Sequence, residues 1–146
     1  MKKNIVLFLA FWALSCTTYG SEKAQEFEEP ILNVSLIKLI MNPENYLGHN
    51  VQVLGYANSL ESALYLTKNH AEMRDHMSSI DIRDNTDAGY LSIPCFNGWK
   101  YIQAKVEVRS GGEFYRLGPV VLIREPDGKV CWQASPESLL RSMGSE

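Results

Sequence analysis

Short runs of alternating apolar and polar residues, separated by turns that contain glycine or proline, occupy this chain from about residue 50 to residue 133. The clearest runs are residues 51–56 and 101–108. A period of two places one face of a strand against a core and the other face in solvent. Many short strands between tight turns predict a mainly β fold, either a small barrel or a sandwich.

Further elements are predicted from local signals. Ser35 is an N-cap for a short helix over 36–41, and Asn42-Pro43-Glu44 starts a second helical turn that leaves through Gly48 in a left-handed conformation. Gly55 indicates a bulge in the first strand, and Asn97-Gly98 indicates a turn. The other predicted strands are 63–67, 79–83, 119–123 and 130–132, with helical segments at 68–77 and after Ser135. This gives five or six strands with a leading helix.

The first twenty residues have the organisation of an export signal. Two lysines precede an uninterrupted apolar run, residues 5–14, which as a helix would span about 15 Å, half of a bilayer core. That length is typical of a signal peptide rather than a membrane anchor, and the small residues Thr18 and Gly20 predict cleavage before Ser21. The alternative is a buried N-terminal helix.

Cys16 leaves two exported forms open. Ala13-Leu14-Ser15-Cys16 is an imperfect lipoprotein signal, because Leu14 stands where a smaller residue is usual. A lipidated Cys16 would tether the protein to a membrane surface. Otherwise Cys16 leaves with the signal peptide, and the protein is periplasmic or secreted.

The sequence divides into a signal peptide (1–20), a flexible acidic lead-in (21–33), a barrel domain (34–133) and a short C-terminal helix or tail (134–146). Removing the signal peptide removes two lysines and no acid, which leaves 12 basic and 17 acidic residues and a formal net charge of −5. Phosphate binding needs a basic surface, so we expect no nucleic-acid partner.

Cys95 and Cys131 are the two cysteines that follow the signal region. In an oxidising compartment they most simply form a disulfide, which the chain-entropy model values at about 4 kcal/mol. Two buried thiols and a metal pair are the alternatives. Cys-x-x-Cys spacing is lacking and no histidine lies near either cysteine, so metal binding is less well supported.

No motif with recognisable chemistry stands out, and no serine lies in a G-x-S-x-G elbow. The densest polar cluster comprises His70, Glu72, Asp75 and His76. Because the two histidines are six residues apart, they do not share a helix face, and a solvated surface is the simpler interpretation. Residues 84–87 resemble a calcium loop, but the twelfth position is Cys95 instead of glutamate. We therefore expect no metal, no cofactor and no enzymatic activity.

Aromatic residues are concentrated in the second half of the chain, at Tyr90, Phe96, Trp99, Tyr101, Phe114, Tyr115 and Trp132. In a small barrel most of them should belong to the core. Any exposed ring among Tyr56, Trp99 and Tyr115 would form a stacking or anchoring surface for a protein or a sugar. Arg109, Arg116 and Arg124 would then supply a polar rim, with solvated strand edges as the alternative.

Two phrases carry a family resemblance: N-P-E-x-Y-x-G at 42–48 and V-x-V-x-G at 51–55. Residues 63–66 and 96–106 extend it, although the glycine that usually ends the later strand is missing. Over residues 34–125 the chain resembles small bacterial proteins with an OB-like barrel. The resemblance implies an OB-like β-barrel with a leading helix and no catalytic residue. Such barrels bind nucleic acids, oligosaccharides or proteins.

These observations favour a non-enzymatic binding or protein-interaction module of the bacterial cell envelope. The expected partner is an envelope protein. A small-ligand or glycan binder is the alternative, and a hydrolase with an unrecognised site is a weaker one.

Overall fold

The computed structural model describes residues 29–83, 93, 95–109, 112 and 114–137. Within these residues the elements in chain order are β1 (Leu32–Asn33), α1 (Leu36–Met41), η1 (Pro43–Tyr46), β2 (Asn50–Asn58), β3 (Ala63–Tyr65), α2 (Lys68–Met73), η2 (His76–Ser78), β4 (Ser79–Ile82), β5 (Asn97–Val108), β6 (Tyr115–Arg124) and β7 (Val130–Gln133).

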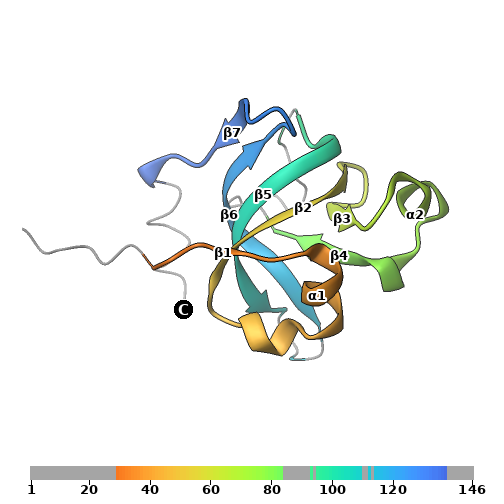
Figure 1. Ribbon diagram of the computed structural model, residues 1–146, viewed down its shortest axis with the longest axis horizontal. Helices are drawn as coiled ribbons and strands as arrows, with labels where there is room; N and C mark the ends of the chain where they lie inside the picture. Colours follow the sequence, from red (N-terminus) through yellow and green to blue (C-terminus); the bar gives the residue numbers. More distant parts are fainter. Residues whose placement is uncertain (1–28, 84–92, 94, 110–111, 113, 138–146) are drawn as a thin grey trace, which may run out of the picture.

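Five strands close into a barrel in the order β2–β3–β4–β6–β5–β2, which Figure 1 shows from the side. β2 pairs antiparallel with β5 over its full length and with β3 at its C-terminal end. β4 and β6 pair in parallel, whereas β5 and β6 pair antiparallel. The short strands β1 and β7 pair outside the barrel, with β2 and β6 respectively. The predicted small OB-like β-barrel is confirmed.

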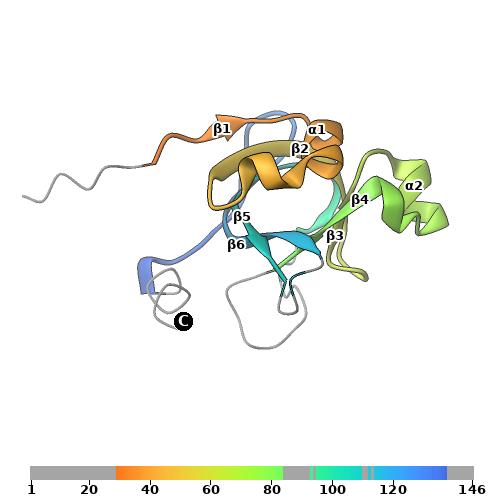
Figure 2. The same cartoon turned by 90° about the horizontal axis from the view of Figure 1, so that it is seen from below.

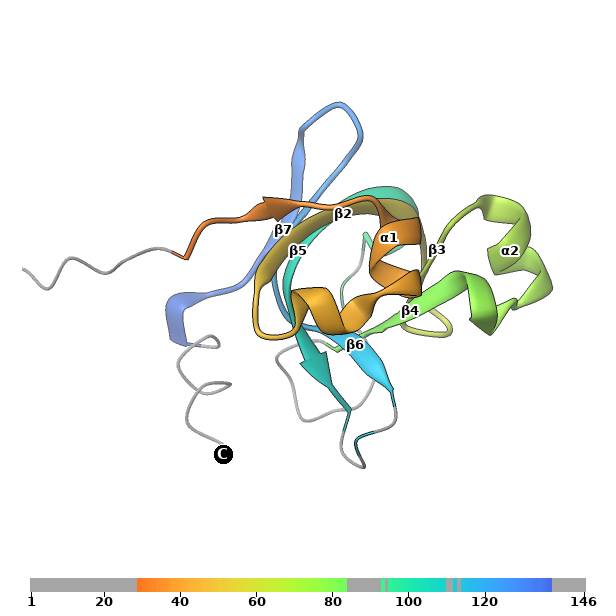
Figure 3. The ribbon, with the colours of Figure 1, turned by 60° about the horizontal axis from the view of Figure 1, so that its bottom comes forward.

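The core follows the predicted alternation of the strands. The inward positions of β2 and β5 are fully buried at Val51, Val53, Ile102, Ala104 and Val106. α1 adds Leu36 and Leu39 to the same core, and Figure 3 shows this helix lying across one end of the barrel. The leading helix therefore closes the barrel.

Gly55 provides room for α1. A Cβ atom at this position would lie 2.5 Å from Leu64 Cγ and 2.7 Å from Leu36 Cδ2. The β2–β5 register continues through Gly55 without interruption, so the predicted bulge is wrong. The glycine is instead needed because the side chains of Leu64 from β3 and Leu36 from α1 fill the space in front of it.

α2 packs on the outer face of β3, at the side of the barrel seen in Figure 2. Thr67 caps it, since its Oγ1 accepts a hydrogen bond from the backbone N–H of His70. The helix is followed by the C-cap residue Arg74, which has a left-handed φ of +54°. Arg74 Nε lies 3.0 Å from Glu61 Oε1, and the Tyr65 hydroxyl donates a hydrogen bond to the same carboxylate. These contacts tie α2 to the loop that precedes β3.

Most predicted boundaries agree with the structure to within a few residues, and Gly48 has the expected left-handed φ of +81°. Asn97-Gly98 is an exception. The turn predicted there is wrong, because both residues lie inside β5 and pair with Asn58 and Ala57 of β2. β1 is a strand that local sequence signals do not indicate.

Several sequence predictions lie outside the described residues. They are the signal peptide (1–20), Cys16, the calcium-like loop (84–87), Tyr90 and the C-terminal segment from residue 138. Within the described part of the chain, no helix has the length and apolar character that a bilayer crossing requires.

Candidate interaction surface

Four large side chains lie side by side on the outer face of the barrel: Leu54, Tyr56, Trp99 and Tyr101. The β2–β5 register places Leu54 opposite Tyr101 and Tyr56 opposite Trp99. Trp99 is 42% exposed and Leu54 39% exposed, whereas the two tyrosines are half-buried. These four residues are termed the outer aromatic patch.

The rings of the patch are held in place before any ligand arrives. Tyr56 and Trp99 form a T-shaped pair with centroids 5.9 Å apart and an interplanar angle of 88°. Tyr56 also packs against the buried cluster of Ala63, Tyr65 and Ala71 that anchors α2. Edge-to-face aromatic pairs are attractive beyond the area that they bury. The indole of Trp99 is therefore restrained, which reduces the entropy that binding would cost.

Amide side chains border the patch at both ends. Asn58 and Asn97 are cross-strand partners beyond Tyr56, and Asn97 Oδ1 accepts hydrogen bonds from Ser59 N at 3.3 Å and Ser59 Oγ at 3.1 Å. Gln52 and Gln103 are partners beyond Leu54 and Tyr101. The patch is therefore an uncharged aromatic centre with amide side chains at both ends and one flanking cation, the exposed Arg124 of β6, which is the cross-strand partner of Tyr101.

The other predicted aromatic candidates behave differently. Phe96 is fully buried, and Tyr115 and Trp132 pack partly buried against the core. Phe114 is exposed near the β5–β6 connection. Tyr115 is the cross-strand partner of Val108, at the end of β5 away from Trp99, so it does not join Tyr56 and Trp99 in one surface.

Arg109 and Arg116 lie toward the opposite end of β5 from Trp99. Arg116 is the cross-strand partner of Glu107, which is eight residues from Trp99 along β5, up to about 26 Å for an extended strand. Arg116 Nε donates to Glu107 Oε1 at 2.7 Å, and Arg109 Nη1 lies 3.7 Å from Asp81 Oδ2. The structure thus separates Arg109 and Arg116 from the aromatic patch that they were expected to border. Arg124, the third arginine of the predicted rim, lies beside the patch as the cross-strand partner of Tyr101.

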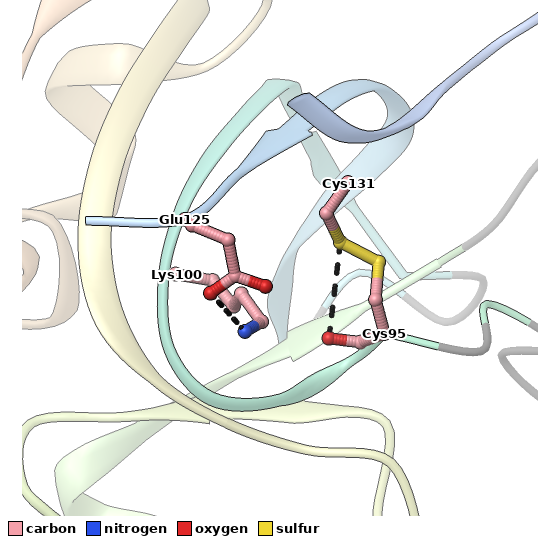
Figure 4. The surroundings of a disulfide bond; sticks show 4 residues. All are labelled: Cys95, Lys100, Glu125 and Cys131. Carbon is pink, nitrogen blue, oxygen red and sulfur yellow. Dashed lines mark hydrogen bonds and ion pairs between the residues drawn. A yellow bond between two sulfur atoms is a disulfide. The ribbon is translucent and has the colours of Figure 1, made fainter. Parts of the chain in front are cut away.

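The predicted disulfide between Cys95 and Cys131 is confirmed, with Cα atoms 6.2 Å apart. Figure 4 shows it connecting the segment before β5 to β7. Cys131 Sγ also lies 3.9 Å from the carbonyl oxygen of Cys95. Since a disulfide sulfur has no proton to donate, this is a van der Waals contact.

Sequence reasoning missed the ion pair beside the disulfide. Lys100 is only 5% exposed, and its Nζ lies 2.6 Å from Glu125 Oε2, in the connection between β6 and β7 (Figure 4). Lys100 occupies the inward phase of β5, together with Ile102 and Ala104. The available signal was a lysine at a position that alternates with the inward residues of the strand. It was missed because the turn predicted at Asn97-Gly98 placed the start of that strand at residue 101.

The two acids of the polar cluster around α2 are engaged in local contacts, whereas the buried Nδ1 of His70 has no hydrogen-bond partner in the described part of the chain. Glu72 pairs with Lys68 at 3.4 Å. The Asp75 carboxylate accepts hydrogen bonds from Ser78 Oγ at 2.7 Å and Met77 N at 3.1 Å, and the bond from Ser78 is the main reason that the pKa of Asp75 is lowered. Among the residues that the structure describes, no three His, Cys, Asp or Glu side chains converge to hold a metal ion.

No protein-family model matches the chain, and neither does any curated protein in a sequence search.

Proposed function

We propose that this protein is an exported, non-catalytic module that binds a protein of the bacterial cell envelope through the outer aromatic patch. The observation that carries the proposal is Trp99, which is 42% exposed on a barrel strand and held edge-to-face by Tyr56. Tryptophan and tyrosine are enriched among the residues that dominate the binding energy of protein interfaces.

The composition of the patch supports a protein partner. Its four side chains carry no charge, although the whole chain has a formal net charge of −3. Depletion of charge at the centre, with aromatic side chains and a polar border, is the usual anatomy of a protein–protein interface. A restrained indole also loses little freedom on binding, so more of its contact energy is available for affinity.

Export is part of the proposal. The Cys95–Cys131 disulfide is typical of proteins that fold outside the reducing cytosol, in keeping with the signal peptide expected at residues 1–20. Intact-mass analysis of the native protein distinguishes two exported forms. An N-terminus near Ser21 corresponds to a periplasmic or secreted protein, and an acylated N-terminal Cys16 to a membrane-tethered one.

Glycan binding is the second candidate, and the amide border favours it specifically. Asn58 and Asn97 lie next to the Tyr56–Trp99 pair, and amides beside an aromatic ring suit the hydroxyl groups and apolar faces of a sugar. The same patch would serve either partner, so the experiment must separate them.

The test is capture from a cell-envelope extract by the immobilised oxidised protein, with identification by mass spectrometry. We expect one stoichiometric protein partner, retained by the wild type and by Phe114→Ala, and weakened about 30-fold by Trp99→Ala. Phe114 is the matched control because it is an exposed aromatic residue outside the patch. Equal retention by Trp99→Ala would refute the proposal. If no protein is retained but immobilised glycans bind in a manner that depends on Trp99, the second candidate replaces the first.

A further inference from the structure

Five charged side chains share the outer face of β4, β6 and β5, toward the end of β5 away from Trp99. They are Asp81, Arg83, Glu107, Arg109 and Arg116, here termed the arginine cluster. The strand register puts Asp81, Arg116 and Glu107 in one row across the three strands. Three arginines face two acids, so the cluster has an excess positive charge on a chain whose overall charge is negative.

Glu107 orients two of the arginines at once. Its Oε1 accepts from Arg83 Nε at 2.8 Å and from Arg116 Nε at 2.7 Å, and its Oε2 accepts from Arg83 Nη2 at 3.2 Å. The bond from Arg116 to Glu107 uses Nε, which leaves the two Nη groups outside this contact. The Arg116 side chain is 21% exposed, so most of it is packed and part of it remains in contact with solvent.

Gly118 shows that space is kept for this arrangement. A Cβ atom there would lie 2.7 Å from Arg83 Cβ and 3.1 Å from Glu107 Oε1. The glycine is not required by a positive φ, since Gly118 is not among the glycines that adopt one. A side chain at this position would displace the Arg83–Glu107 pair.

Arg109 is held much more loosely. Its closest approach to Asp81 is 3.7 Å, and the two side chains are 60% and 49% exposed. Exposed pairs of this kind contribute little to stability, so a ligand anion competes readily for Arg109. A structural role accounts for Arg83 and Arg116, which both bond to Glu107. It does not account for Arg109, whose pairing with Asp81 contributes little to stability.

We propose that the arginine cluster binds a single oxyanion group, a carboxylate or a phosphate. The Nη groups of Arg116 hold it, and Arg109 turns from Asp81 to the same group. Guanidinium forks match the planar and tetrahedral oxyanions with paired hydrogen bonds. Glu107 and Asp81 repel additional negative charge, so the site takes one anionic group and not a polyanion. This site is separate from the outer aromatic patch and independent of the function proposed for it.

The test follows the arginine Nε–Hε resonances by NMR, using ¹⁵N-labelled protein from cells that express the full chain. The probes are inorganic phosphate and N-acetylglycine, a blocked carboxylate, each titrated at constant ionic strength against a chloride reference. We expect saturable shifts at Arg83 and Arg116 with at least one probe. Arg116→Gln should weaken binding about tenfold or more, because it removes the charged fork. The matched control is Arg124→Gln, an exposed arginine at the other end of β6 whose loss should leave the affinity unchanged.

Each outcome decides the question. Saturation by phosphate or by N-acetylglycine supports the site and identifies which oxyanion it prefers. Shifts that remain linear to about 50 mM of both probes overturn the proposal, since such a site would be too weak to select a ligand. The same affinity in Arg116→Gln also overturns it. If Arg116→Gln fails to fold, Arg109→Gln takes its place, because Arg109 is exposed and its replacement should still weaken binding about threefold or more.

Discussion

Replacing Cys95 and Cys131 together by serine should lower the free energy of unfolding by about 4 kcal/mol. The bridge closes a loop with a sequence separation of 36 residues. For a loop of that length the chain-entropy model gives an unfolded-state restriction of about 13 cal/mol/K, which is about 4 kcal/mol at 25 °C. That is a large part of the stability of an ordinary small domain, about 5–15 kcal/mol.

The loss should be uneven across the fold. β7 pairs with β6 at residues 122–124, Trp132 packs against the core, and the Cys131 disulfide adds a second covalent link, to the segment before β5. The barrel strands close through pairs that do not involve β7. We therefore expect the reduced protein to keep the barrel and to lose amide protection first in β7.

Urea unfolding measured by circular dichroism tests the predicted loss of unfolding free energy. Hydrogen exchange tests whether β7 loses amide protection first. Reduced wild type is the matched control for the Cys95→Ser/Cys131→Ser variant, because it lacks the bridge without any change of sequence. The two should unfold at the same urea concentration, well below oxidised wild type. A difference of less than about 1 kcal/mol between oxidised and reduced wild type would refute the reasoning, since the bridge would then not restrict the unfolded chain.

Three further predictions concern single sites. Glu125→Ala leaves the buried ammonium of Lys100 without its partner and should lower the free energy of unfolding by about 2 kcal/mol, a value reduced because Glu125 is one-third exposed. The double variant Lys100→Met/Glu125→Ala should recover most of this stability in thermal unfolding. Gly55→Ala should cost about 1–3 kcal/mol in urea unfolding, because its Cβ would overlap two core leucines. Burial, followed by the Glu61 carboxylate, raises the pKa of Tyr65 above its usual value of 10.0. The folded protein therefore keeps a proton that the unfolded chain releases, and stability should fall as the pH rises above 10. Tyr65→Phe should flatten that decline.

Each of these predictions has a contradicting result. If the double variant at Lys100 and Glu125 is no more stable than Glu125→Ala, the unpaired ammonium is not the cause of the loss. A Gly55→Ala variant as stable as wild type would show that Leu64 and Leu36 can move away from β2 at little cost. An alkaline decline that is equally steep in Tyr65→Phe would assign it to other groups.

Much of the barrel was predictable because its strands are half-buried and period two is a direct consequence of that burial. Residues 51–56 and 101–108 lie within β2 and β5, and Gly48 ends the helical turn as expected. The turn predicted at Asn97-Gly98 is wrong because the local turn preference competes with pairing to a strand some 40 residues earlier in the chain. The ladder to Ala57 and Asn58 prevails, and no local signal reports it.

The candidate site was predictable only as single residues. Tyr56 and Trp99 were each identifiable as potential binding aromatics, but their contact depends on the β2–β5 register, which spans 43 residues between them. Arg109 is closer to Trp99 in sequence than Tyr56 is, yet it lies at the other end of β5. Closeness in sequence is a poor guide along a strand, because each residue adds about 3.3 Å.

The placement of the two surfaces on one strand makes a final prediction. Trp99 and Glu107 are eight residues apart along β5, a span that extended geometry places at up to about 26 Å. Effects of mutations add when the sites are more than about 7–10 Å apart and share no partner. Trp99→Ala/Arg116→Gln should therefore lose partner capture and oxyanion binding to the same extents as the single variants, with additive changes in unfolding free energy. Capture and NMR titration of the four proteins measure this. An oxyanion affinity that changes with Trp99→Ala, or capture that changes with Arg116→Gln, would mean that one ligand spans both surfaces, and the two sites would then have to be treated as one.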